Sequence, residues 1–149
     1  MCPYQELNLK PNPTTTAETP RLWNWDVAEA FIGSEFNHIA HYRELQVSPQ
    51  SEWVDLDIDR DRPQTRRGMN WNSGYEVRGR IDTERKIWYG EMRIPMKAFE
   101  AFTPRPGAEL RVGLYRISGQ DPKKIHTAWR PTAQKTFHVP EAFGLLKLE

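Results

Sequence analysis

The sequence predicts an all-β fold, an antiparallel β-sandwich of the jelly-roll type. Two observations indicate this class. Short apolar runs recur between turn signals along most of the chain, which is typical of sandwiches. No long segment shows helical periodicity, and the strand–helix alternation of parallel sheets is absent. Because 149 residues fit one domain and hardly two, we expect residues 1–149 to form a single domain.

The first elements are separated by clear turn signals. Tyr4–Leu9 is strand-like, and residues 8–21, with three prolines and four threonines, predict an irregular loop. Val27–Ile32 is a strand candidate that ends before a Gly-Ser pair, and His41–Val47 is one that ends before a Ser-Pro pair.

The next candidate, Trp53–Ile58, alternates well. Val54, Leu56 and Ile58 share one face, while Trp53 and three aspartates (Asp55, Asp57 and Asp59) share the other. The acidic face is expected to be solvated and paired with nearby arginines, which are Arg60, Arg62, Arg66 and Arg67.

The second half continues in the same manner. After a long charged and Asn/Gly-rich loop at 59–74, Tyr75–Ile81 and Lys86–Ile94 predict a hairpin around a turn at 82–85. Pro95–Phe102 predicts one helical turn. The remaining strand candidates are Leu110–Ile117, Ile125–Trp129 and Phe143–Leu148.

Composition excludes several classes of protein. The 21 basic and 20 acidic residues leave a net charge of +1, so no overall field favours nucleic acid or an anionic membrane. No apolar run approaches the ~18 residues that span a bilayer, and no signal peptide is visible. The single cysteine, Cys2, excludes an internal disulfide and a cysteine-rich zinc site.

Catalytic and metal motifs are weak. No G-x-S-x-G is present, and no pair of carboxylates can be selected for glycoside hydrolysis, so we expect no enzyme. The aspartates at 55, 57 and 59 begin like a calcium loop, but Arg60 and Arg66 stand where an EF-hand needs Gly and Glu. His38 and His41 are three residues apart with no evident third ligand, so no metal site is predicted.

Aromatic residues in loops are the strongest functional signal. Trp23 and Trp25 precede a strand, Trp71 lies in the Asn/Gly loop, and Phe137-His138 precedes the last strand. Flat rings beside strands can pack on the C–H faces of sugars. Trp88 and Trp129, which lie inside strand-like runs, are expected in the core, and the place of Trp53 is left open.

Ordered segments of the chain resemble family 9 carbohydrate-binding modules. Residues 22–31 (LWNWDVAEAF) resemble the W-x-x-D-x-x-E-x-F segment of that family, and 42–49 (YRELQVSP) resemble the strand that follows it. Arg93-Ile94-Pro95 is similar to its I-P step. Residues 128–132 (AWRPT) and 137–144 (FHVPEAFG) resemble its C-terminal segments.

The resemblance implies a sandwich that binds sugars without cleaving them, often beside xylan-degrading enzymes, in carbohydrate catabolism. It places an aromatic clamp at Trp23 and Phe137, a carboxylate for sugar hydroxyls at Glu29, and a polar contact at Gln46. Xylan-binding members carry Trp and Arg where this chain has Phe137 and Gln46, so the sugar stays open. Trp25, Trp71 and His138 are weaker candidates. Members can also hold structural Ca²⁺, for which no ligands are assigned here.

The residues themselves leave the role of Glu29 open. It shares a strand face with apolar Val27 and Phe31, which indicates either a half-buried functional carboxylate or an arginine pair. Asp26, its near neighbour, is expected to form a turn by hydrogen bonding to backbone.

The family also implies two or three strands before the point where this chain begins. Their absence would expose a sheet edge, so either a missing segment or a partner is expected to cover it. The family habit further suggests an extracellular or periplasmic location.

Two alternatives remain. One is a haem-binding electron-transfer sandwich, for which Met69, Met92, Met96 and the histidines are available. The other is a domain attached to a glycoside hydrolase that has no binding activity of its own.

Overall fold

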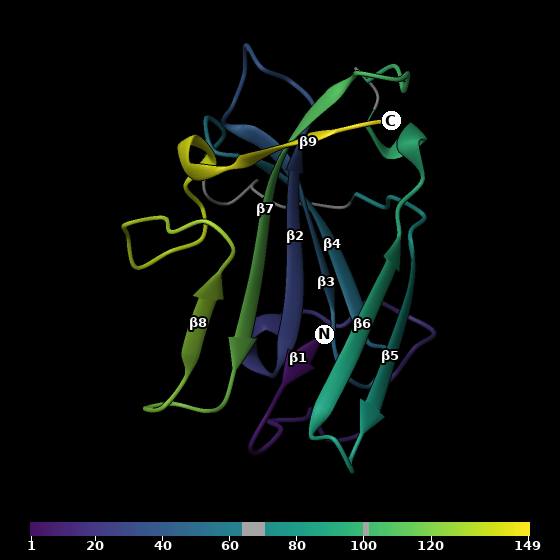
Figure 1. Cartoon of the computed structure of the whole chain (residues 1–149), viewed down its shortest axis with the longest axis vertical. Coiled ribbons are helices and arrows are strands. Elements are labelled where there is room, and N and C mark those ends of the chain that lie inside the picture. The colour runs from purple at the N-terminus through teal and green to yellow at the C-terminus, as the bar shows by residue number, and fades with distance from the viewer. Residues whose placement is uncertain (64–70, 100–101) are drawn as a thin grey trace.

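A computed structural model describes residues 1–63, 71–99 and 102–149 as an all-β fold (Figure 1). Its strands are β1 (Cys2–Pro3), β2 (Val27–Gly33), β3 (His41–Val47), β4 (Trp53–Asp59), β5 (Glu76–Asp82), β6 (Ile87–Arg93), β7 (Glu109–Ser118), β8 (Ile125–Ala128) and β9 (Gly144–Lys147). Among the described residues the only helical pieces are single 3-10 turns: η1 (Leu22–Asn24), η3 (Met96–Ala98) and η4 (Pro140–Ala142).

The strands form two antiparallel sheets that pack as a sandwich, which confirms the predicted fold class. The shorter sheet has the order β1-β6-β5. The longer has the order β4-β3-β2-β7-β8, and β9 also pairs with β7. β5 and β6 contact β3, and in Figure 1 they lie on the side of the molecule opposite β8.

The space between the sheets holds the main core. Alternate residues of β2, β3 and β7 supply its floor, because successive side chains of a strand point to opposite faces. The buried cluster comprises Ala30, Ile32, Leu45, Tyr75, Ala98, Phe99, Leu110 and Val112. Trp88 of β6 is fully buried, which confirms that it is a core residue.

The two sheets approach closely at Gly79. A Cβ atom added there would lie 2.5 Å from the carbonyl oxygen of Ser48 and 2.6 Å from that of Pro49. The hydroxyl group of Ser51 accepts a hydrogen bond from the Gly79 N–H at 2.8 Å. Only a residue without a side chain permits this contact.

The other face of the long sheet is covered as well. Phe31, Tyr42, Ile58, Tyr115 and Phe143 form a second buried cluster there. Val27, Val54 and Ile117 continue this face as a third cluster with Leu22 from η1. The C-terminal segment between β8 and β9 therefore packs on the face that the shorter sheet leaves free.

Most predicted elements lie within one or two residues of their observed bounds, but Tyr4–Leu9 is not a strand. Near the N-terminus, Cys2 and Pro3 pair with β6, and the Tyr4 N–H donates to the carbonyl oxygen of Lys86 at 2.9 Å. Asn8 instead fixes the following loop, because its carbonyl oxygen accepts from the Asp26 N–H at 2.9 Å and its side chain donates to two further carbonyls. The irregular loop at 8–21 contains no strand or helix, as predicted.

The expectation that Trp129 is a core residue is wrong. The residue is 57% exposed, and its ring lies against the backbone of Gly144. The Trp129 N–H donates to the carbonyl oxygen of Leu114 on β7, and the Leu114 side chain is 47% exposed as well. Of the described strands, β5 and β6 lie over β3, on the side of the molecule opposite β8, which leaves these two side chains exposed.

The tryptophan left open by the sequence, Trp53, packs edge-on against Tyr75 at the core between the sheets, with ring centroids 5.7 Å apart. The aspartates of its strand are less solvated than expected. Asp55 is buried and accepts hydrogen bonds from the backbone and hydroxyl of Ser73. Asp57 pairs with Arg43 and Arg62.

Asp59 is buried and pairs with Arg62 at 3.1 Å. Of the arginines expected to neutralise this strand, Arg66 and Arg67 lie outside the described residues, as does the stretch 64–70 of the long loop.

Candidate functional site

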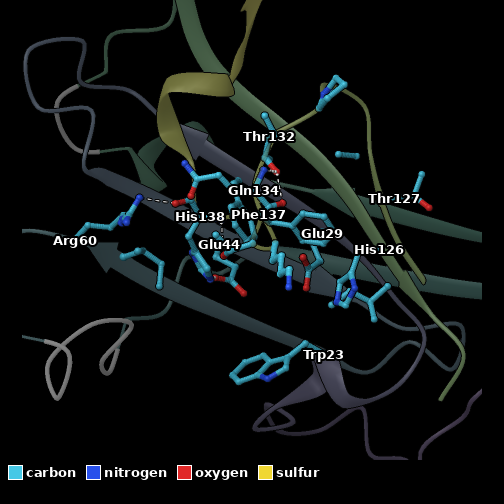
Figure 2. Close-up of a pocket in the computed structure, with 18 of the residues that line it drawn as sticks. Trp23, Glu29, Glu44, Arg60, His126, Thr127, Thr132, Gln134, Phe137 and His138 are labelled. Atoms are coloured by element: carbon cyan, nitrogen blue, oxygen red, sulfur yellow. Dashed lines mark hydrogen bonds and ion pairs between the residues drawn. The ribbon is translucent and has the colours of Figure 1, made fainter. Parts of the chain in front are cut away.

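An open cavity of about 1450 Å³ lies on the face of the long sheet that carries Glu29 and Phe31 (Figure 2). Strands β2, β3, β4 and β7 supply its floor, and the segment after β8 supplies one wall. The lining residues are Trp23, Glu29, Phe31, Glu44, Leu56, Ile58, Arg60, Ile117, residues 126–128 and residues 131–138. It thus joins parts of the chain more than a hundred residues apart.

The two aromatic residues of the expected clamp, Trp23 and Phe137, both line this cavity. Both are partly exposed, and both pack against the same buried cluster, which includes Val27 and Ile117. In Figure 2 Trp23 lies apart from the group of labelled residues that includes Phe137, Glu29 and Glu44. The backbone position of Trp23 is set by η1. This turn is closed by the Trp25 N–H, which donates to the carbonyl oxygen of Leu22.

Phe137 is held in place from behind. Its ring stacks on Tyr115 with centroids 4.3 Å apart and planes inclined by 14°, and His126 meets it edge-on at 5.4 Å. One face of the ring is therefore already occupied by protein.

Glu29 lies on the cavity floor beside a second carboxyl group, that of Glu44. The pair arises from strand register, because Glu29 is opposite Gln46 and Phe31 is opposite Glu44 in the β2–β3 ladder. Gln46 Nε2 donates to Glu29 Oε1 at 2.9 Å and to Glu44 Oε1 at 2.6 Å. The side-chain partner of Glu29 is therefore an amide. No described arginine pairs with it, so the alternative of an arginine pair is wrong.

Burial changes the acidity of this pair. Glu29 and Glu44 are each 4% exposed. Loss of water raises the pKa of Glu29 well above its usual range, and the neighbouring Glu44 charge raises it further. Burial also raises the pKa of Glu44 to about 7, although the hydrogen bond from Gln46 opposes the shift. The two groups thus hold a proton more tightly than exposed carboxyls, and together they can offer both a donor and acceptors.

Gln46 itself is fully buried and does not line the cavity. Its amide positions the two carboxyl groups from below. A direct contact between Gln46 and a ligand, as the family resemblance implies, stays a prediction.

The weaker candidates divide between cavity and remote positions. His138 lines the cavity, where its Nδ1 lies 2.7 Å from the Tyr42 hydroxyl and its Nε2 lies 3.9 Å from Glu44 Oε2. Trp25 and Trp71 do not line it. Lys10 Nζ lies 6.0 Å from the Trp25 ring, and the Arg43 guanidinium lies 4.7 Å from the Trp71 ring.

Asp26 bonds to backbone, as expected, but the bond joins residues 93 positions apart and does not form a turn. It is fully buried, and its Oδ1 accepts from the Gly119 N–H at 2.8 Å. Burial raises the pKa of this carboxyl, while the hydrogen bonds from Gly119 and Asn8 oppose that shift.

Several lining residues were not found by sequence reasoning. Glu44 could have been found, because it alternates with Tyr42 and Gln46 on the face that Glu29 shares. The polar side chains of Thr132, Gln134 and the other residues between 131 and 136 carried no such signal, since they belong to an irregular segment that tertiary packing brings over the sheet.

Of the side chains considered as haem ligands, two histidines, His126 and His138, line the cavity, and no described methionine does. Met92 and Met96 pack against the core between the sheets, and Met69 lies outside the described residues. Among the residues that the structure describes, the groups of side chains that could hold a metal ion lie elsewhere, around His38. No helix among the described residues has the length and apolar character needed to cross a bilayer.

No protein-family model matches the sequence, and no curated protein matches it. The fold is similar to that of a Bacteroides uniformis protein whose structure is described as that of a "putative carbohydrate-binding protein", with a TM-score of 0.68 and 17% sequence identity. The similarity covers 91% of this chain and 66% of the neighbour, so this chain spans just under two thirds of the neighbour's length. At this identity the likeness establishes a shared fold.

Proposed function

We propose that the chain is a non-catalytic carbohydrate-binding domain related to family 9 modules. It holds one sugar unit of an oligosaccharide or polysaccharide in the cavity on the long sheet, in support of carbohydrate catabolism. The observation that carries the proposal is the cavity itself: aromatic rings of Trp23 and Phe137 border a floor that contains two buried, hydrogen-bonded carboxyl groups.

The aromatic rings account for affinity. A sugar presents an apolar C–H face, and burying ~100 Å² of such surface against rings contributes roughly 2–3 kcal/mol at ~25 cal/mol per Å². Trp23 is partly exposed and free of ring stacking with the described aromatic residues, whereas one face of Phe137 is covered by Tyr115. Trp23 is therefore the main platform, and Phe137 is the smaller opposite wall.

The carboxyl groups account for orientation. Sugar hydroxyls donate and accept hydrogen bonds, and Glu29 with Glu44 offers both functions at the cavity floor. Because Gln46 holds one oxygen of each group, the pair is ordered before a ligand arrives, which lowers the entropic cost of binding. Thr132, Gln134 and Arg60 supply further polar groups along the cavity.

The same carboxyl pair is the one feature that favours a second function, glycoside hydrolysis, which uses two carboxyl groups near the scissile bond. Both groups here lie on the floor above one buried amide that bonds to each, and this arrangement fits hydroxyl recognition better than attack on a bond. Turnover distinguishes the two functions.

The test is a glycan array on the purified chain, followed by titration calorimetry with the sugars that bind. We expect saturable binding with a Kd roughly between micromolar and sub-millimolar values, and no hydrolysis of xylan or aryl glycosides. Absence of binding to any sugar at millimolar concentration would contradict the proposal. Hydrolysis that disappears with Glu29→Gln would show that the chain is a glycoside hydrolase and not a binding domain.

A further inference from the structure

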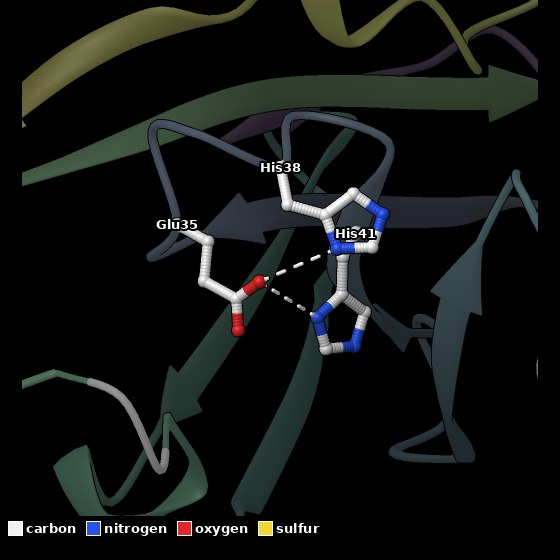
Figure 3. A group of neighbouring side chains, drawn as sticks. All are labelled: Glu35, His38 and His41. Carbon is white, nitrogen blue, oxygen red and sulfur yellow. Dashed lines mark ion pairs between the residues drawn. The ribbon is translucent and has the colours of Figure 1, made fainter.

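A cluster of metal-ligating side chains lies at the connection between β2 and β3 (Figure 3), and none of its three residues lines the cavity. Glu35 and His38 belong to this connection, and His41 is the first residue of β3. One carboxylate oxygen, Glu35 Oε2, lies 3.5 Å from His38 Nδ1 and 3.4 Å from His41 Nδ1. Ligand atoms of all three residues lie within 4.8 Å of one another.

These separations match the edges of a tetrahedral site. Two ligands at ~2.0–2.1 Å from a tetrahedral zinc ion are about 3.3–3.4 Å apart. The two Glu35–histidine distances are close to this value before any ion draws the ligands in. Side-chain exposures of 29% for Glu35, 39% for His38 and 18% for His41 leave the site open to an ion and to a fourth ligand such as water.

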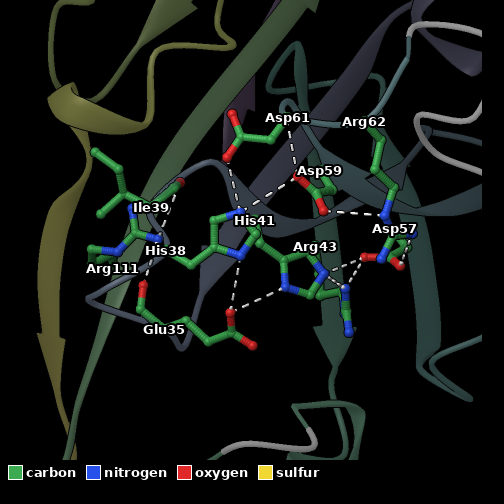
Figure 4. Close-up of polar contacts among 10 residues, drawn as sticks. All are labelled: Glu35, His38, Ile39, His41, Arg43, Asp57, Asp59, Asp61, Arg62 and Arg111. Atoms are coloured by element: carbon green, nitrogen blue, oxygen red, sulfur yellow. Dashed lines mark hydrogen bonds and ion pairs between the residues drawn. The ribbon is translucent and has the colours of Figure 1, made fainter.

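The outer nitrogens of both imidazoles face carboxylates (Figure 4). His38 Nε2 lies 3.1 Å from Asp61 Oδ2, and His41 Nε2 lies 2.7 Å from Asp57 Oδ1. For His38, the carboxylate at Nε2 keeps the proton on that nitrogen, which leaves the Nδ1 lone pair directed at the shared space. Histidines that bind metals in proteins usually have such a partner.

The loop that carries the ligands is anchored. Arg111 Nη2 donates to the carbonyl oxygens of Glu35 at 3.0 Å and of Ile39 at 3.3 Å. The His41 N–H donates to the carbonyl oxygen of His38 at 3.1 Å, which closes the turn between the two histidines. The ligands therefore start from defined backbone positions.

We propose that Glu35, His38 and His41 form a binding site for a divalent transition-metal ion, with zinc as the best fit. Two imidazole nitrogens and one carboxylate oxygen are borderline ligands that suit zinc, whereas calcium prefers six to eight oxygens. Its three residues do not line the sugar cavity, and the site does not depend on the proposed carbohydrate binding. Sequence reasoning missed it because Glu35 looks like an ordinary loop residue.

Two arrangements compete with this proposal. Arg43 Nη1 lies beside both His41 Nε2 and Asp57, so His41 could accept from Arg43 and direct an Nδ1–H at Glu35, which would block metal binding. A second group, His38 with Asp59 and Asp61, could hold an ion on the other side of the same ring.

The experiment titrates the chelator-stripped chain with Zn²⁺ by calorimetry and follows its thermal unfolding. We expect one site with a Kd in the micromolar range and a Tm that rises by several degrees under saturating zinc. Calcium at the same concentration should leave the Tm unchanged. X-ray absorption of the zinc complex should show nitrogen and oxygen ligands at about 2.0–2.1 Å.

Single variants assign the ion to its ligands. Glu35→Gln, His38→Ala and His41→Ala should each lower zinc affinity at least tenfold, and Asp61→Asn should lower it about tenfold through His38. His126→Ala, which removes an exposed histidine outside the cluster, is the matched control and should retain affinity. Far-ultraviolet circular dichroism confirms that each variant is folded.

Three results overturn the proposal. Zinc could fail to bind at millimolar concentration, which is the outcome expected if His41 accepts from Arg43. Glu35→Gln and His41→Ala could retain full affinity. Asp61→Asn could abolish binding while Glu35→Gln does not, and the ion would then lie between His38 and the aspartates.

Discussion

The carboxyl groups of Glu29 and Glu44 accept hydrogen bonds from a single amide nitrogen, that of Gln46, at 2.9 and 2.6 Å. The strands that carry them, β2 and β3, are paired, so the charge on one carboxyl group always acts on the other. The effect extends to Tyr115, whose pKa is raised to about 12 by burial and by the Glu29 charge. The floor of the cavity is thus a coupled polar unit in an apolar surrounding.

This unit makes stability depend on pH. Because the folded-state pKa of each carboxyl is raised above its unfolded value of ~4.3, the folded chain binds more protons than the unfolded chain between about pH 4.5 and pH 7. The free energy of unfolding should therefore decrease as pH rises through this window, by on the order of 1–3 kcal/mol. Urea denaturation at pH 4.5, 5.5, 6.5 and 7.5 measures it.

The matched variant for this prediction is Glu44→Gln, which should make the slope shallower. Glu18, whose pKa is raised to about 7 by burial and by Asp55, and the buried Asp26 retain part of the dependence. Glu141→Gln, at an exposed position, should leave the slope as it is. An unchanged slope in Glu44→Gln would contradict the description of the pair.

Removal of the shared donor should destabilise the fold. In Gln46→Leu the two buried carboxyls lose the amide that bonds both, and an unsatisfied buried polar group costs about 1–3 kcal/mol. We expect a loss of roughly 2–4 kcal/mol at pH 7 and less at pH 4.5, where both acids are protonated. Thermal and urea unfolding at the two pH values measure it. Equal losses at both values would show that packing, not charge, dominates.

Trp23 should dominate sugar binding. Trp23→Ala is expected to weaken binding at least tenfold, because it removes the exposed ring on which a sugar face can pack. Tyr89→Ala, an aromatic truncation on the shorter sheet, should leave sugar affinity unchanged and serves as the control. Calorimetry with the best sugar from the array measures both variants. If Trp23→Ala binds normally, the ligand does not lie against this wall.

Gly79→Ala should destabilise the contact between the sheets. The added methyl group would lie 2.5–2.6 Å from the carbonyl oxygens of Ser48 and Pro49, which are backbone atoms and cannot swing away. A loss of about 1–3 kcal/mol is expected by analogy with overpacked cores. Arg78→Ala, at the exposed neighbouring position, is the control in the same urea titration. A Gly79→Ala protein as stable as the wild type would indicate that the sheets can separate there at little cost.

Strand positions were predictable because their signals are local. His41–Val47 was predicted with its observed bounds, since alternation and the Ser-Pro stop both lie within the segment. Tyr4–Leu9 failed because its apolar spacing has no sheet neighbour, and the bonds of Asn8 stabilise a loop instead. Trp88 and Trp129 have the same strand-like context, yet one is buried and the other is 57% exposed.

The sequence by itself determined the all-β class, the strand order along the chain, and which side chains share a face, because these follow from a period of two residues and from turn chemistry. Only the tertiary structure decided which face is covered, and by what. The segment from 129 to 143 folds back over β2 and β7, while the shorter sheet covers β3. Contacts between residues distant in sequence, such as that of Tyr42 with His138, depend on packing of the whole chain and have no local signal.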